Sequence, residues 1–207
     1  MTMSEIFDAV FKGDLGKAKA GVEAALEAGA APQEIIYEQM IPAMEAIGAE
    51  FEAGKVFVPN LLLAARAMKG ALEILKPLLT AGQSTTVGKV VIGTVKGDLH
   101  DIGKNLVASM LEGCGFEVMN LGIDVPKEKF VAAVRESGAD ILCLSALLTT
   151  TMGYMKEVID AVRAEDLPVK IMVGGAPVSA EYAAQVGADG YSANANEAVS
   201  LAKSLLG

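Results

Sequence analysis

The hydrophobic pattern of this 207-residue chain changes near residue 88, and this change constrains the fold more than any other feature. Before it, apolar residues recur every three or four positions; after it, short apolar runs alternate with amphipathic stretches. The first pattern is typical of packed helices, and the second of parallel strands joined by helices. Segment 81–88 has the small, polar composition of a flexible linker. We therefore predict a helical domain over residues 1–82 and an α/β domain over residues 88–207.

Four amphipathic helices are predicted in the first domain, and the short loops between them favour an antiparallel four-helix bundle. Ser4 and Asp14 are residues that cap helices well, so we expect them to begin the first two. Pro32 fits the first turn of the third helix, and Pro42 predicts a kink within it. The predicted helices cover residues 4–11, 14–28, 32–53 and 59–79.

The second domain alternates strands with helices, which predicts a doubly wound parallel sheet covered on both faces, of the Rossmann or flavodoxin kind. Ligands of such sheets bind beyond the carboxyl ends of the strands. His100, the threonines 149–151 and the pair Gly174-Gly175 all follow predicted strands. The predicted strands are 90–95, 116–121, 140–145, 169–173 and a short one at 190–191.

Composition excludes several classes of function. The net charge is −9, and the 17 basic residues are scattered among 26 acidic ones, so a nucleic-acid partner is not expected. The N-terminus lacks the pattern of a signal peptide, and no apolar run is long enough to span a membrane. We therefore expect a cytoplasmic protein without a membrane partner. Cys114 and Cys143 are interpreted as buried, inert thiols.

The chain contains one histidine, His100, which follows the first predicted strand within Asp98-Leu99-His100-Asp101-Ile102-Gly103. An isolated histidine is more often an inert, hydrogen-bonded loop residue than a ligand. Here, however, Asp98 can orient the ring, as carboxylates do for metal-bound histidines, and the glycines reduce crowding. One histidine cannot form a structural zinc site. A macrocycle that supplies the equatorial ligands would leave one axial position for His100.

Other candidate residues have two interpretations each. Gly174-Gly175 is either a tight turn or a place where a ligand passes close to the backbone. The hydroxyl groups of threonines 149–151 either cap the next helix or point at a ligand. Asp124 and Asp189, near strand ends, are interpreted as solvated turn residues.

Three motifs together resemble a known signature. Asp98-x-His100-x-x-Gly103, Ser145-x-Leu147 and Gly174-Gly175, in this order and spacing, are similar to the cobalamin-binding signature of base-off/His-on corrinoid proteins. The helical half also resembles the four-helix cap of methionine synthase and of small methyltransferase corrinoid proteins, through Phe57-x-Pro59 and residues 61–68. The resemblance covers nearly the whole chain.

The resemblance implies a role for each matched residue. His100 would replace the dimethylbenzimidazole of cobalamin as the lower axial ligand of cobalt, and Asp98 would hydrogen-bond the other nitrogen of the ring. Thr151, where methionine synthase has a serine, would complete this relay. The region from Phe57 to Met68 would shield the upper face of cobalt. The remaining residues predicted to contact the cofactor, including those lining the tunnel for its nucleotide tail, are Asp101, Ile102, Gly103, Ser145, Leu147, Thr149, Gly174, Gly175 and Tyr191.

The resemblance also implies a methyl carrier that works with partner proteins rather than a self-sufficient enzyme. A donor-specific methyltransferase would load the methyl group, a second one would pass it to tetrahydrofolate or a thiol, and a reductive activation protein would restore the cofactor. Methoxylated aromatics, methylamines, methanol and betaines are all possible donors. The alternatives are the cobalamin-binding subunit of an adenosylcobalamin-dependent mutase and a cobalamin-based sensor. The helical cap argues against the mutase subunit, and the acidic charge against a DNA-binding sensor.

Overall fold

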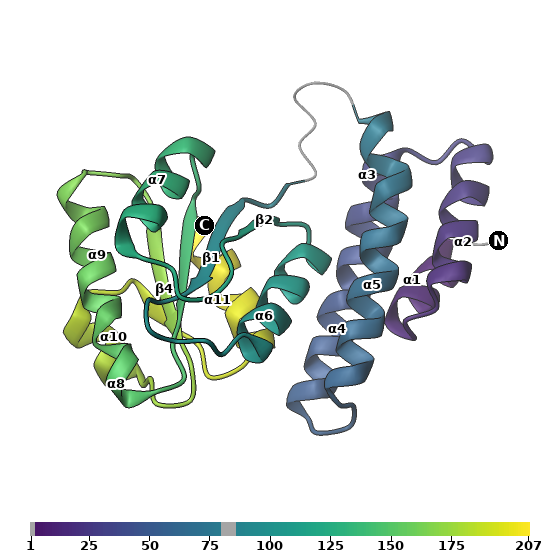
Figure 1. Ribbon diagram of the computed structural model, residues 1–207. Coiled ribbons are helices and arrows are strands. Elements are labelled where there is room, and N and C mark those ends of the chain that lie inside the picture. The colour runs from purple at the N-terminus through teal and green to yellow at the C-terminus, as the bar shows by residue number, and fades with distance from the viewer. Residues whose placement is uncertain (1–2, 80–85) are drawn as a thin grey trace. The chain divides into compact units, whose positions relative to one another are not determined.

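The computed structural model describes residues 3–79 and 86–207, with side chains from Glu5 onward (Figure 1). The chain forms two compact units, Met1–Val87 with Glu112–Gly115, and Gly88–Leu111 with Phe116–Gly207. Most of the predicted linker 81–88 lies outside the described residues. No helix in the described ranges is long and apolar enough to cross a membrane.

The first unit is a bundle of helices, as predicted (Figure 1). Its third helix is continuous along the chain but changes type, from α to π and back to α. The fourth ends in a single 3-10 turn. The bounds are α1 Met3–Phe11, α2 Leu15–Glu27, α3 Pro32–Ile35, η1 Ile36–Met40, α4 Ile41–Glu52, α5 Val58–Leu75 and η2 Lys76–Leu78.

Local chemistry explains these helix limits. Asp14 caps α2, because its side chain accepts the backbone N–H of Lys17 at 3.0 Å. The predicted cap at Ser4 is wrong, since α1 begins at Met3 and already includes Ser4. Near Pro42, the predicted irregularity takes the form of the π turn, in which the Ile41 N–H bonds to the Ile36 carbonyl five residues back. Proline has no N–H to continue the regular ladder, and π turns are a common adjustment inside helices.

The second unit contains a five-stranded parallel sheet in the order β2-β1-β3-β4-β5. The chain starts at β1, adds β2 on one side and then returns to add β3 on the other. The switch point of the sheet therefore lies between β1 and β3, where open α/β sheets bind ligands. The strands are β1 Lys89–Thr94, β2 Glu117–Asn120, β3 Ile141–Ser145, β4 Lys170–Gly174 and β5 Gly190–Tyr191.

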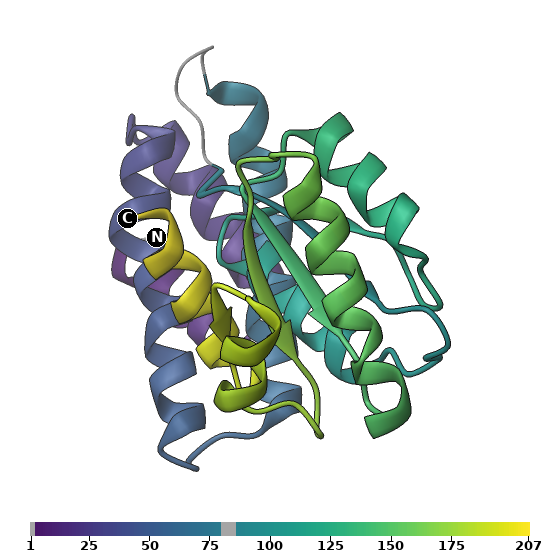
Figure 2. The ribbon, with the colours of Figure 1, turned by 90° about the vertical axis from the view of Figure 1, so that its left-hand side faces the viewer.

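Helices cover both faces of this sheet. Figures 1 and 2 show α6 and α11 on one face and α7 and α9 on the other. Two helices follow β3 rather than one: α8 already includes the threonines 149–151, and α9 begins after Gly153. The bounds are α6 Ile102–Gly113, α7 Lys127–Ser137, α8 Thr149–Met152, α9 Tyr154–Ala164, α10 Ala180–Val186 and α11 Ala195–Leu206.

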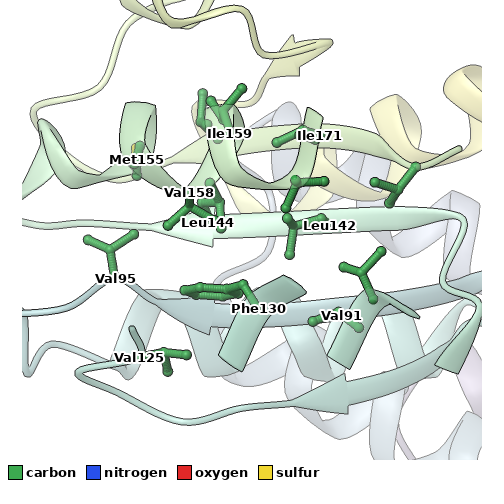
Figure 3. Packing of buried hydrophobic residues seen from close by; sticks show 14 of the residues in the cluster. Val91, Val95, Val125, Phe130, Leu142, Leu144, Met155, Val158, Ile159 and Ile171 are labelled. Atoms are coloured by element: carbon green, nitrogen blue, oxygen red, sulfur yellow. The ribbon is translucent and has the colours of Figure 1, made fainter. Parts of the chain in front are cut away.

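The core under α7, α9 and α10 fixes the strands from one side. Phe130 of α7 lies among strand residues such as Leu142 and Leu144 (Figure 3). A Cβ atom on Gly93 of β1 would lie 2.7 Å from the Phe130 ring, so only glycine leaves room for it. Close packing of this kind holds the strand ends, and the loops that leave them, in fixed positions.

The two cysteines are buried, as predicted. Cys143 lies in the middle of β3, and burial raises the pKa of its thiol to about 12. Such a thiol stays protonated and unreactive at neutral pH.

Candidate functional site

The loop between β1 and α6, residues 95–101, carries His100 at the switch point of the sheet. Buried Thr94 donates its hydroxyl to the His100 carbonyl at 2.9 Å, which fixes the far end of the loop. Gly97, at a φ of +83°, allows the turn that precedes the motif. Its N–H donates to Asp124 Oδ1 at 2.7 Å. The loop is therefore anchored to β1 and to the segment that follows β2.

Asp98 is fully buried and accepts five hydrogen bonds. Its Oδ1 accepts the backbone N–H of His100 at 3.0 Å and lies 2.8 Å from Nδ1 of the same residue. Its Oδ2 accepts the Thr151 hydroxyl at 2.6 Å and the N–H groups of Leu147 and Leu148 at 2.8 and 3.3 Å. The structure thus brings Asp98, His100, Thr151 and Leu147 together, although up to 53 positions separate them.

These bonds decide the charge of Asp98 and the tautomer of His100. Burial disfavours the carboxylate, but the hydrogen bonds from Thr151, Leu147 and His100 outweigh it and hold the pKa of Asp98 well below its ordinary value. An ionised carboxylate only accepts hydrogen bonds, so Nδ1 of His100 must donate. In the neutral ring, Nε2 then carries the free lone pair, which is the form that binds metals.

The side chain of His100 is partly exposed, whereas that of Asp98 is fully buried. The His100 side chain retains 49% of its accessible surface, and Nε2 has no hydrogen-bond partner in the described part of the chain. Within the same described residues, no group of three or more His, Cys, Asp or Glu side chains is placed to hold a metal ion. The site therefore offers one nitrogen, and a metal bound here needs its other ligands from elsewhere.

Exposed apolar side chains lie close to His100 in the sequence and also follow neighbouring strands of the sheet. Leu99 and Ile102, on either side of His100, are 68% and 86% exposed. Ile123 follows β2, and Leu147 and Leu148 follow β3, all of them more than 40% exposed. Large apolar side chains left in water at one edge of a sheet are typical of a binding surface for an apolar ligand. This chemistry fits a large, largely apolar macrocycle with one open axial position.

Of the three glycines in the predicted signature, the chain itself requires only Gly175. A Cβ atom on Gly103 would meet nothing within 4 Å, so the chain itself leaves open space there. Gly175, in contrast, has a φ of +137°, and a Cβ atom on it would lie 1.8 Å from the Ala146 carbonyl oxygen. The close approach expected at Gly174-Gly175 is therefore, at Gly175, an approach of the chain's own loop after β3. A Cβ atom on Gly174 would make an ordinary contact, 3.5 Å from the Ser192 carbonyl oxygen.

The remaining predicted residues lie at the same edge but make fewer contacts with the Asp98 cluster. Ser145 ends β3 and pairs in register with Thr94 and Gly174, so three strand ends are level. Thr149 is exposed in the first turn of α8. Asp101 accepts the side-chain N–H of Asn105 just before α6. Tyr191 is half-buried in β5 and packs against the core beneath α7, α9 and α10, two strands away from β3.

Several anchoring contacts do not follow from the sequence pattern. Asp124 anchors Gly97, and Asp189 accepts both the Ile171 N–H and the Arg163 side chain at 2.6 Å. Both residues are exposed in bends, as expected of solvated turn residues, but each also holds a backbone N–H of a neighbouring segment. Thr94 was also missed, although a lone hydroxyl at the end of an otherwise apolar strand is a signal that could have drawn attention to it.

Comparisons with known proteins point to one family. A family model described as a B12 binding domain matches residues 88–200, and a second one with the same description matches residues 3–76. Dimethylamine corrinoid protein 3 of Methanosarcina acetivorans is 43% identical over 206 residues, which cover 99% of this chain and 96% of the relative.

Two solved structures share both the fold and the sequence. A cobalamin-binding protein from Desulfitobacterium hafniense is 35% identical, with a TM-score of 0.83 over 100% of this chain and 99% of the other. A chain of the methanol:cobalamin methyltransferase complex from Methanosarcina barkeri is 33% identical, with a TM-score of 0.87 over 99% of this chain and 79% of that one.

Proposed function

This chain belongs to the family of corrinoid proteins that have a B12 binding domain, and from this we propose that it is the methyl carrier of a multi-component methyltransferase system. The names of the similar proteins support this role: one is a dimethylamine corrinoid protein, and another is part of a methanol:cobalamin methyltransferase complex. A corrinoid is accordingly the cofactor of the protein.

The hydrogen bond between Asp98 and the His100 ring is the observation that supports this proposal most strongly. The pair presents a single, oriented imidazole nitrogen beside exposed apolar side chains, which suits a metal whose equatorial ligands come from a macrocycle. We propose that His100 would hold the cobalt of the corrinoid, in the base-off/His-on mode, and that Asp98 and Thr151 would orient it. When bound, the corrinoid supplies the cobalt centre on which a methyl group is carried.

The chain's own residues prepare the imidazole for this task. Asp98 holds the proton of His100 at Nδ1, so that the ring stays in one tautomer and one orientation. Thr151 and the two backbone N–H groups keep Asp98 ionised in a buried position. The residues that we propose to contact the cofactor besides these three are Asp101, Ile102, Gly103, Ser145, Leu147, Thr149, Gly174, Gly175 and Tyr191.

We assign activation of the methyl donor to a partner methyltransferase and delivery to a second one, with tetrahydrofolate or a thiol as acceptor. Family models described as B12 binding domains match residues 3–76 and 88–200, which are most of the described residues, and this supports a division of labour with partner proteins. The resemblance to a dimethylamine corrinoid protein makes a methylamine the first donor to test. A reductive activation protein is the third proposed partner.

Reconstitution tests the proposal. The purified chain is loaded with cobalamin, reduced, and mixed with a dimethylamine methyltransferase and either dimethylamine, methylamine or methanol. Visible spectroscopy and mass spectrometry of the extracted cofactor should find methylcobalamin with one donor and none without the methyltransferase. A protein that is isolated with adenosylcobalamin and accepts no methyl group under any of these conditions would contradict the methyl-carrier role.

A further inference from the structure

We infer that Lys104 is a positioning residue for the loop that carries His100. Its buried ammonium group joins the first turn of α6, which continues this loop, to the end of β2. The inference rests on the proposed function, because it concerns the residue that we assign as cobalt ligand.

The burial of Lys104 is unusual. Only 4% of the residue is exposed, whereas lysines are almost never buried unless they pair with a carboxylate. In the described residues Lys104 forms no ion pair. Instead, Nζ donates to Oδ1 of Asn105 and Oδ1 of Asn120, both at 2.7 Å.

Two effects disfavour a charged lysine at this position. Burial lowers the pKa of Lys104, and the nearby charge of Asp101 offsets this only in part. The residue also lies in the first turn of α6, where the helix dipole disfavours a positive charge. A methionine of similar length would avoid both costs but would make neither hydrogen bond, so the role of Lys104 lies in the segments that its hydrogen bonds connect.

These hydrogen bonds belong to a closed network. Asn120 Nδ2 donates to Asn105 Oδ1 at 3.1 Å, the Gly122 N–H donates to Asn120 Oδ1 at 3.1 Å, and Asn105 Nδ2 donates to Asp101 Oδ2 at 2.9 Å. Each amide oxygen accepts two hydrogen bonds, which is its full capacity. The network therefore acts on the chain itself rather than on a ligand.

The consequence is that one segment holds the His100 loop at both ends. At the start of the loop, Asp124 accepts the Gly97 N–H. At its end, Asp101 is linked through Asn105 and Lys104 to Asn120. Asn120 and Asp124 lie four residues apart at the end of β2 and in the turn that follows it. The loop that carries His100 is thus hydrogen-bonded at both ends to residues 120–124, and we call these two sets of hydrogen bonds the clamp. Lys104 completes the set at the end of the loop.

Two variants that break the clamp from opposite sides test the inference. K104M removes the ammonium group, and N120A removes its acceptor on β2. N120D keeps an acceptor for Lys104, and K156M, which changes an exposed lysine on α9, is the matched control. For each protein we would measure hydrogen exchange of amides 97–103 without cofactor, the dissociation constant of cobalamin, and the nitrogen coupling to Co(II) in the electron paramagnetic resonance (EPR) spectrum.

We expect K104M and N120A to exchange these amides faster, to bind cobalamin about tenfold more weakly and to lose part of the nitrogen coupling. N120D should retain most of each property and K156M all of them. Wild-type exchange rates in both K104M and N120A would overturn the inference, and N120A decides alone if K104M does not fold. Failure of the ligand assignment is distinguishable, because it would appear as missing histidine coupling in the wild type, and failure of the methyl-carrier role would appear only in the reconstitution.

Discussion

Asp98 Oδ1 accepts the backbone N–H of His100 at 3.0 Å and lies 2.8 Å from Nδ1 of the same residue. One buried oxygen therefore fixes both the backbone and the ring of the histidine. The other oxygen is held by residues on the far side of the switch point, which follow β3. The orientation of His100 thus depends on the packing of β1 against β3, and not on its own loop alone.

Replacing Asp98 by asparagine should destabilise the cofactor-free protein in a pH-dependent way. An amide places an NH₂ group either against the His100 donors or against the N–H of Leu147, and we expect a loss of about 2 kcal/mol at pH 7. The pKa of Asp98 is lowered on folding, so its contribution is fully present above the unfolded value of 3.8 and is lost as the pH falls through the folded value. Urea unfolding at pH 7 and pH 3 should show the difference between D98N and wild type shrinking at pH 3. An equal difference at both would contradict this assignment.

Thr151→Val keeps the shape of the side chain but removes its hydroxyl. Because that hydroxyl donates to buried, ionised Asp98 at 2.6 Å, we expect a loss of about 1.5 to 3 kcal/mol in the free energy of unfolding. Thr151→Ser keeps the donor and should lose much less. Urea unfolding of both variants at pH 7 provides the comparison, and equal losses would show that the methyl group, rather than the hydroxyl, matters.

Gly103→Ala should change stability and cofactor binding in opposite directions. Gly103 is the second residue of α6, and a Cβ atom there meets nothing in the chain, so alanine should stabilise the cofactor-free fold by about 0.5 kcal/mol. If the open space serves the corrinoid, the added methyl group should weaken cobalamin binding. Gly16→Ala is the matched control, since Gly16 is the second residue of α2 and would make only one contact, at 3.6 Å. Unchanged cobalamin affinity in G103A would mean that the space is not used.

Cys143 should resist alkylation in the native protein. Burial raises the pKa of its thiol to about 12, so the reactive thiolate is scarce and inaccessible near pH 8. Mass spectrometry after treatment with iodoacetamide should find Cys143 unmodified in buffer and modified in guanidinium chloride. Labelling in buffer at the rate of a free thiol would show that β3 opens far more readily than its packing indicates.

The fold could be predicted from the sequence because hydrophobic spacing determines which faces are buried. The strands, most helices and the parallel character of the sheet follow from that spacing and from residues such as Asp14 and Gly138, which limit helices. The sequence predicts an irregularity near Pro42 but not that it is a π turn. Proline lacks an N–H, and a helix can adjust in several ways to the hydrogen bond that is lost.

The site could be predicted only where the residues lie close together in the motif. Asp98 and His100 are two positions apart, so a contact between their side chains was a reasonable expectation. The hydrogen bonds of Thr94 and Asp124 to the His100 loop could not be predicted. They depend on how distant segments pack in the fold, and no local sequence pattern contains that information. The geometric need for Gly175 comes likewise from the Ala146 carbonyl, on the neighbouring strand end.

Binding of the corrinoid cobalt by the His100 imidazole can be measured directly. Because the sequence has one histidine, growth on ¹⁵N-histidine labels one imidazole. We would load labelled and unlabelled protein with cobalamin, reduce it to Co(II) and record the EPR spectra. We expect the nitrogen coupling to change from three lines with ¹⁴N to two with ¹⁵N, and to be lost in H100A. Three lines in both samples would place a nitrogen of the cofactor itself on cobalt and contradict the assignment.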